Sequence, residues 1–142
     1  MKLILVRHAA YGGSGQNPGL SDEGKMQAAQ LARLIEADVE GDIVIWSSTA
    51  KRASETAEII LNNFSKGAGI LSHFEKLWSD NWHEYDFDWL KRQLNEFQGE
   101  TLVLVSHLEY VQWFPAQIGF KTNDAGYAEG VKIHDGECVY FG

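Results

Sequence analysis

Three short apolar runs constrain the fold of this chain more than any other feature. They occupy residues 3–6 (LILV), 42–46 (DIVIW) and 102–105 (LVLV). Their apolarity is continuous rather than alternating, which is typical of strands buried on both faces of a sheet. Helical patterns separate the runs. The sequence therefore predicts an α/β fold in which helices cover both faces of a mainly parallel sheet, giving a three-layer α/β/α sandwich.

Four helices are predicted. Three start near short polar residues, at Ser21, at Ser48 or Thr49, and at Asp86, and the fourth follows His107. In the first, apolar residues recur at offsets of 0, 3, 4 and 7, which describes one buried helix face. Gly99 is expected to end the third helix, and Pro115 to kink or end the fourth. The C-terminal sequence VKIHDGECVYF predicts two strands joined by a tight turn at Asp135-Gly136.

Length and charge limit the possible functions. The 142 residues suffice for one domain with its own core, and we expect a single domain over residues 1–142. The formal charge of -8 argues against general binding of nucleic acids or anionic membranes, because both need a basic surface. The single cysteine, Cys138, cannot form an internal disulfide, and the first apolar run is too short for a signal peptide or a membrane span. We expect a cytoplasmic protein.

Polar residues follow each of the three apolar runs. These residues are Arg7-His8, Ser47-Ser48 and Ser106-His107. Ligands of open α/β sheets bind beyond the carboxyl ends of the strands, so in neighbouring parallel strands these side chains should converge. The pattern predicts a site that contains an arginine and two histidines.

Arg52 strengthens this interpretation. It lies in the first turn of the second predicted helix, where the helix dipole disfavours a cation and favours a bound anion. Guanidinium groups bind phosphoryl oxygens with paired hydrogen bonds, so Arg7 and Arg52 indicate a phosphoryl group. The sequence contains no HExxH motif and no cysteine pair. We therefore expect no metal and no cofactor, which leaves a histidine as the candidate nucleophile.

Four segments in the right order resemble the histidine phosphatase superfamily, which includes the cofactor-dependent phosphoglycerate mutases. They are LILVRHA, LSDEGKMQAAQLARLI, SSTAKRASETAEII and LVLVSHLEYV. The small size is most similar to the short phosphohistidine phosphatase branch. The resemblance implies the phosphoglycerate mutase-like fold and places the phosphate-binding arginine at Arg52 and the second histidine at His107.

The resemblance also implies a mechanism. His8 attacks phosphorus and becomes phosphohistidine, Arg7, Arg52 and His107 hold the phosphoryl oxygens, and water then releases phosphate. Leu108 is expected to contact the substrate. Such a protein would be a metal-independent phosphatase for a phosphomonoester or a phosphoramidate, including protein phosphohistidine. Its partners would be small phosphorylated molecules or phosphoproteins.

The expected general acid is missing from its usual place. The family presents a glutamate in a Leu-x-Glu segment, whereas this chain reads FEKLWSDNWHEYDFDW over residues 74–89, with serine at position 79. Asp80 and Glu84 are the nearest carboxylates, and Asp80 lies closest to the expected position. Glu109 could repel a phosphate dianion, attract a basic substrate or simply face solvent. Four aromatic residues could form a wall that selects the substrate, although Trp89 is equally well explained as core: Trp78, Trp82, Tyr85 and Trp89.

Three alternatives remain open on the sequence alone. A phosphoglycerate mutase is disfavoured because a chain this short has little room for the segments that enclose its substrate. A non-catalytic phosphate-recognition module would retain the arginines but not turnover, which the altered acid segment allows. A metal-dependent hydrolase would use His8 and His107 as ligands.

Overall fold

The central sheet has six strands and spans the whole molecule. A computed structural model describes residues 1–142. The strands are β1 (Lys2–Arg7), β2 (Ile43–Ser47), β3 (Gly69–His73), β4 (Thr101–Ser106), β5 (Gly130–His134) and β6 (Glu137–Phe141). They lie in the order β3-β2-β4-β1-β5-β6. Strands β1 to β4 are parallel, and only β5 and β6 run antiparallel to their neighbours, so the mainly parallel sheet is confirmed.

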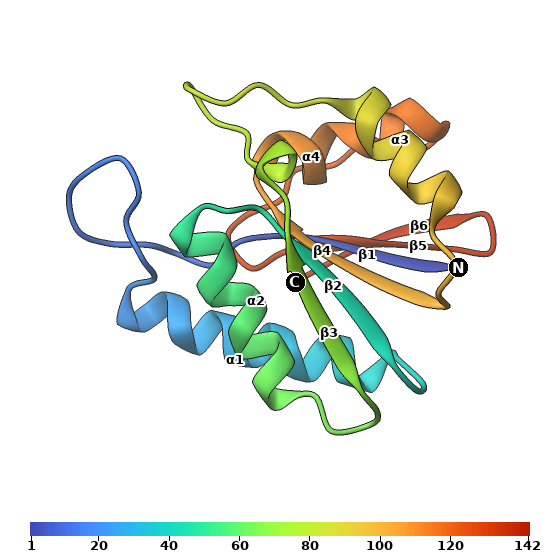
Figure 1. Cartoon of the computed structure of the whole chain (residues 1–142), viewed down its shortest axis with the longest axis horizontal. Helices are drawn as coiled ribbons and strands as arrows, with labels where there is room; N and C mark the ends of the chain where they lie inside the picture. The colour runs from blue at the N-terminus through green and yellow to red at the C-terminus, as the bar shows by residue number, and fades with distance from the viewer.

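Helices cover both faces of this sheet. They are α1 (Asp22–Ala37), α2 (Lys51–Asn63), α3 (Phe87–Glu96) and α4 (Leu108–Trp113), with short 3-10 helices at η1 (Glu75–Leu77) and η2 (Phe114–Ile118). Figure 1 shows α1 and α2 below the sheet and α3 and α4 above it, which confirms the three-layer α/β/α arrangement. None of these helices combines the length and the apolarity that crossing a membrane requires.

Local side-chain chemistry explains most helix boundaries. The Ser21 hydroxyl accepts a hydrogen bond from Gly24 N at 3.0 Å, and the Asp86 carboxylate caps α3 in the same way. Pro115 lies where α4 gives way to η2, as predicted. The second helix starts later than predicted, at Lys51, because the Ser48 hydroxyl bonds a histidine ring and Ala50 stands at the cap position.

Each face of the sheet has its own apolar core. Side chains alternate along β1, so Ile4 and Val6 face α1 and α2 whereas Leu3 and Leu5 face α3 and α4. The same alternation divides β4 between the two cores. All four β1 side chains are at most 2% exposed. Burial on both faces is the physical reason that these runs are apolar without interruption.

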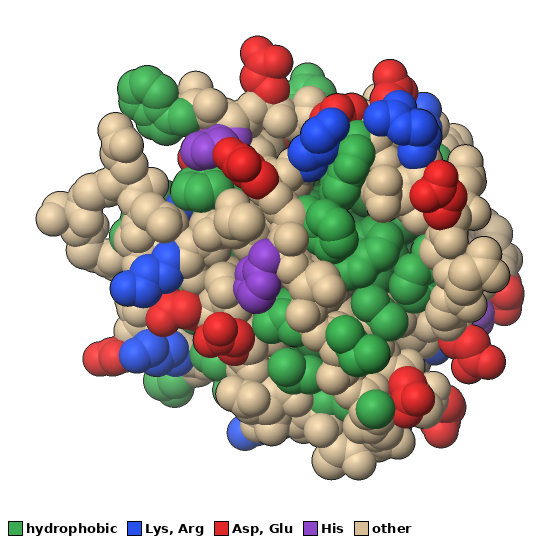
Figure 2. Space-filling view, in the orientation of Figure 1, with side chains coloured by type: hydrophobic (Ala, Val, Ile, Leu, Met, Phe, Trp, Pro, Cys, Tyr) green, Lys and Arg blue, Asp and Glu red, His purple; other side chains and the backbone are tan.

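The edge strand β3 has no matching signal in the sequence. It reads GILSH, and Ile70, its second residue, is 63% exposed. Figure 2 shows hydrophobic side chains gathered on the visible face in the region that α3, β2 and β3 occupy in Figure 1. An edge strand with only one neighbour needs no continuous apolar run.

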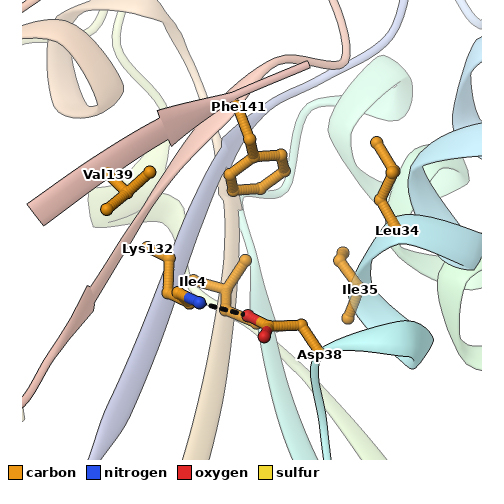
Figure 3. Close-up of a pocket in the computed structure, with 7 residues that line it drawn as sticks. All are labelled: Ile4, Leu34, Ile35, Asp38, Lys132, Val139 and Phe141. Atoms are coloured by element: carbon orange, nitrogen blue, oxygen red, sulfur yellow. Dashed lines mark ion pairs between the residues drawn. The ribbon is translucent and has the colours of Figure 1, made fainter.

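The C-terminal hairpin extends the sheet beyond α1. Asp135 and Gly136 have φ values of 51° and 78°, the left-handed conformations that a two-residue hairpin turn requires. The hairpin and α1 border an apolar pocket of about 170 Å³, in which Val139 and Phe141 face the helix (Figure 3). Lys132 crosses this pocket to Asp38 at 2.9 Å. The pocket is lined by no histidine, serine or cysteine and lies away from the carboxyl ends of the parallel strands.

Candidate active site

The polar strand ends converge in one open pocket of about 190 Å³. It is lined by six residues predicted from the sequence: Arg7, His8, Arg52, Asp80, His107 and Leu108. Strands β1 and β4 are neighbours in register, with Arg7 opposite Ser106, which brings His8 and His107 side by side. Their ring centroids are 5.0 Å apart. Glu84 is exposed and does not line the pocket.

The surroundings of the His8 ring define its tautomer. Its Nδ1 lies 2.8 Å from the Ala9 carbonyl oxygen, so this nitrogen carries the proton and donates it. Arg52 Nε donates to His8 Nε2 at 3.3 Å, which requires a free electron pair on that nitrogen. Burial lowers the pKa of His8 to about 3, with the charges of Arg52 and Arg7 adding to this effect and the Ala9 carbonyl opposing it. His8 is therefore a neutral imidazole with the free electron pair of Nε2 at the pocket.

Arg52 connects the two histidines. Its side chain is buried, and while Nε donates to His8, Nη2 lies 3.5 Å from His107 Nδ1. The guanidinium group lies between the aromatic rings of Tyr11, at 5.2 Å, and Trp78, at 5.8 Å. Its neighbour Lys51 is exposed, as expected for a solvated charge.

Thr56 joins helix α2 to the loop after β1. Its hydroxyl accepts a hydrogen bond from Ala9 N at 3.1 Å and donates to the Arg52 carbonyl oxygen at 2.8 Å. Thr56 and Ala9 are both fully buried. This contact fixes the backbone next to His8 relative to the helix that carries Arg52.

His107 is as deeply buried as His8. Its Nε2 lies 2.8 Å from the Ser48 hydroxyl. Because Arg52 can only donate, the Nδ1 of His107 accepts a hydrogen bond. The proton of the neutral ring is then on Nε2, which donates a hydrogen bond to the Ser48 hydroxyl oxygen. The pKa of His107 is lowered to about 2, chiefly by burial, with the nearby His8 and Arg52 contributing to the decrease and the Asp80 charge opposing it. Ser48, which directly follows β2 as predicted, thus orients the second histidine.

Arg7 is held from the opposite side of the pocket. Its Nη1 donates to the Ala125 carbonyl oxygen at 3.0 Å, and its guanidinium carbon lies 4.3 Å above the Tyr127 ring. The Nε of Arg7 is buried and has no hydrogen-bond partner within the protein. A buried donor without an acceptor is costly, which fits a group that a ligand completes.

Asp80 lies in the pocket as an acceptor of hydrogen bonds. Its Oδ1 accepts from the backbone nitrogens of Trp82 and His83 and from His83 Nδ1, at 2.7 to 2.9 Å. Its Oδ2 accepts from Trp78 Nε1 at 2.8 Å and lies 3.8 Å from Arg52 Nη2. Burial alone would raise the pKa of Asp80, but the hydrogen bonds from His83, Trp82 and Trp78 lower it to about 2. These contacts favour a role in positioning the loop over the predicted role of proton donor.

Several site residues have no signal in the sequence. Tyr11 lines the pocket, and Tyr127, whose ring centroid is 5.9 Å from that of Tyr11, lies against Arg7. The sequence drew attention to Ser79 and Glu109 but not to their contact, in which Ser79 donates to Glu109 Oε2 at 2.8 Å. Of the four aromatic residues considered for a wall, only Trp78 lies against the site. Trp82 is 77% exposed and Tyr85 is also exposed, whereas Trp89 is buried in the core. Tyr11 follows His8 by three residues, which is the one hint that the sequence offers.

The assembled groups suit the transfer of a phosphoryl group. A neutral imidazole nitrogen faces a pocket that two guanidinium groups and a second imidazole surround. Such donors stabilise the charge that develops on phosphoryl oxygens during in-line attack. No group of three or more histidine, cysteine, aspartate or glutamate side chains is arranged to hold a metal ion.

Curated relatives match part of the chain. The mitochondrial serine/threonine-protein phosphatase Pgam5 of Drosophila virilis is 40% identical over 75 residues, which is 50% of this chain and 26% of that protein. Pgam5 of Drosophila mojavensis is 44% identical over 64 residues, covering 42% of this chain and 22% of that protein. The chain therefore spans about a quarter of the length of these relatives.

Solved structures match almost the whole chain. The protein histidine phosphatase SixA complexed with tungstate has a TM-score of 0.79 at 18% identity and covers 99% of this chain and 94% of its own. A mutant phosphoserine phosphatase from Entamoeba histolytica in complex with phosphoserine has a TM-score of 0.63 at 17% identity, covering 99% and 95%. These similarities confirm the predicted phosphoglycerate mutase-like fold.

A family model described as the histidine phosphatase superfamily (branch 1) matches residues 3–100. The match includes β1 with His8, the start of α2 with Arg52 and the segment around Asp80, and it ends just before β4. It covers more than half of the sequence, and so the chain belongs to branch 1 of the histidine phosphatase superfamily.

Proposed function

We propose that this protein is a metal-independent phosphatase that hydrolyses a phosphomonoester or a phosphoramidate, including protein phosphohistidine, through a phosphohistidine intermediate at His8. The observation that carries the proposal is the tautomer of the neutral His8 ring. Two independent contacts, from the Ala9 carbonyl and from Arg52 Nε, assign the free electron pair to Nε2 in a pocket lined by cations. A nucleophile needs this arrangement, whereas a phosphate-binding site does not.

The geometry supports two successive displacements. In the first, His8 Nε2 forms a bond to phosphorus as the bond from phosphorus to the leaving group breaks. The Arg52 N–H groups that donate to the two histidine rings in the free protein would donate to the phosphoryl oxygens instead. The buried Nε of Arg7 would also gain an acceptor. In the second, water attacks phosphorus, phosphate leaves, and His8 returns to its neutral form. Leu108 supplies an apolar contact at the rim of the pocket.

The pocket and the similar proteins support the proposed substrate class. The pocket is open, which admits either a small phosphorylated molecule or a phosphorylated side chain on a protein. SixA is a protein histidine phosphatase and Pgam5 a serine/threonine-protein phosphatase. The net charge of -8 disfavours nucleic acids and anionic membranes as partners, and the single cysteine fits the reducing cytoplasm.

The test measures hydrolysis of p-nitrophenyl phosphate with a chelator present. We expect turnover by the unaltered protein, loss of turnover in His8→Ala, and an unchanged rate in the control His73→Ala, which removes an exposed histidine. Quenching in alkaline detergent should leave phosphate on the unaltered protein in an alkali-stable form that acid then releases, and His8→Ala should carry none. Loss of activity with the chelator would indicate a metal-dependent hydrolase instead. Binding of phosphate without any turnover would indicate a phosphate-recognition module.

A further inference from the structure

We propose that Glu109, held by the buried hydroxyl of Ser79, is the carboxyl group that protonates the leaving group. This inference rests on the proposed phosphatase function and assigns the step that the sequence gives to Asp80. Glu109 lies in the first turn of α4, two residues after His107, and lines the same pocket as His8 and Arg52.

Asp80 is poorly arranged to donate a proton. Four hydrogen bonds from Trp78, Trp82 and His83 point at its two oxygens, and Arg52 adds a positive charge. A proton placed on either oxygen would meet a donor hydrogen already directed there. These donors stabilise the ionised carboxylate, and the pKa of Asp80 falls to about 2. Asp80 is thus a positioning residue, which closes the 80–83 turn and holds Arg52 and Trp78.

Glu109 has the freedom that Asp80 lacks. Its Oε2 accepts one hydrogen bond, from Ser79 at 2.8 Å, and its Oε1 has no partner within the protein. The side chain is half-buried, and Ser79 is only 2% exposed. A buried hydroxyl directed at a carboxylate restricts its position, and one free oxygen remains at the pocket for a substrate atom.

Ser79 explains how the site retains an acid without the usual glutamate. Ser79 occupies the segment where the family resemblance places that glutamate, and its hydroxyl reaches across the pocket to Glu109. The carboxyl group then comes from the start of α4 rather than from the segment after η1. Both positions border the same pocket.

The proposed step balances. As His8 Nε2 bonds to phosphorus, the leaving oxygen or nitrogen takes the electron pair of the broken bond and the proton of Glu109. The Glu109 carboxylate then accepts a proton from the water that attacks phosphohistidine, so the second displacement restores both residues.

The experiment compares two substrates that differ in how much they need a proton. Phenyl phosphate has a poor leaving group and 2,4-dinitrophenyl phosphate a good one. We expect Glu109→Gln, which retains an acceptor for Ser79, to lower kcat/KM for phenyl phosphate by about 10²-fold to 10⁴-fold. The same variant should change the rate for 2,4-dinitrophenyl phosphate by less than about threefold, since general-acid catalysis contributes little where the leaving group needs no proton.

Two further variants make the result specific. Asp80→Asn should lower kcat/KM for both substrates to a similar extent, because it displaces Arg52 whatever the leaving group. Glu75→Gln removes an exposed carboxylate from η1 and should change neither rate. If Asp80→Asn alone shows the difference between substrates, or if Glu109→Gln affects both equally or neither, the assignment to Glu109 is overturned while the phosphatase function stands. Absence of turnover in the unaltered protein overturns both.

Discussion

Arg52 shows how one residue can report on a ligand. The start of a helix disfavours a cation, and burial disfavours a charge, yet Arg52 is only 7% exposed in the first turn of α2. Asp80, the carboxylate that forms an ion pair with it, is 3.8 Å away and already accepts four hydrogen bonds. The Arg52 charge is therefore only partly compensated within the protein. A phosphoryl dianion at His8 Nε2 would supply the missing compensation, which is why we expect substrate binding and transition-state stabilisation to depend on this residue.

The prediction for Arg52 compares the effect of its substitution with that of substituting the neighbouring cation, Lys51. Arg52→Ala should lower kcat/KM for p-nitrophenyl phosphate by about 10²-fold to 10³-fold, the usual cost of removing a donor to a developing oxyanion. Arg52→Lys should recover little of this, because an ammonium group cannot donate in the paired geometry of a guanidinium. Lys51→Ala makes the same change of net charge at an exposed position and should leave kcat/KM within about twofold. Equal losses in Arg52→Ala and Lys51→Ala would mean that only the overall field attracts the substrate.

At the scale of elements, helix α1 positions the loop that follows His8. Gly24, in its first turn, is buried against Ala10, and a Cβ at this glycine would overlap the Ala10 carbonyl oxygen. The same oxygen accepts a hydrogen bond from Ser21 N at 3.1 Å. The helix and the loop are thus in backbone contact two residues from His8, the proposed nucleophile, and only glycine permits that approach.

Gly24→Ala should therefore act on both stability and catalysis. Forcing a methyl group into this contact should lower the free energy of unfolding by about 1–3 kcal/mol, more than the helix propensity gained from alanine. It should also lower kcat, because the displaced loop carries His8. Gly12→Ala is the control, since its Cβ would meet Ser21 Cβ at an ordinary 3.4 Å. Guanidinium unfolding and p-nitrophenyl phosphate turnover measure the two effects. A Gly24→Ala protein as stable and active as Gly12→Ala would contradict this account.

The elements also show what a sequence can and cannot predict. Burial on both faces leaves continuous apolar runs, so β1, β2 and β4 and the polar residues at their ends could be recognised. The edge strand β3 is half-exposed and leaves no such pattern. Contacts that depend on where two loops meet, such as Ser79 with Glu109 or Arg7 with Tyr127, have no local signature. Most of the predicted residues lie at or next to the end of a strand or the start of a helix, whereas the missed contacts join residues from separate segments.

The molecule as a whole is acidic, whereas its candidate site is buried and cationic. The formal charge is -8, yet the pocket contains Arg7, Arg52 and two histidines that burial keeps neutral. Substrate capture must therefore be local, because the long-range field repels an anion. Raising the ionic strength should weaken this repulsion and should not raise KM steeply, in contrast to an enzyme that attracts its substrate through a basic surface.

The buried histidines also link folding to pH. The pKa values of His8 and His107 fall from 6.5 in the unfolded chain to about 3 and about 2 in the folded protein. Below pH 6.5 the unfolded chain binds protons that the folded protein does not, so acid favours unfolding. The free energy of unfolding should fall as pH is lowered from 6.5 to 4.5, by about 1 kcal/mol per pH unit for each histidine. Asp80 loses its contribution only below pH 3.8, outside this range.

Urea unfolding at several pH values between 6.5 and 4.5 measures this dependence. His8→Asn removes one of the two groups and should reduce the slope of unfolding free energy against pH by about half. His73→Asn removes an exposed histidine and should leave the slope unchanged. A stability independent of pH over this range would mean that the folded protein protonates His8 and His107 as readily as the unfolded chain. The attacking nitrogen would then lack its free electron pair at pH 5, and the nucleophilic role of His8 would have to be restricted to higher pH.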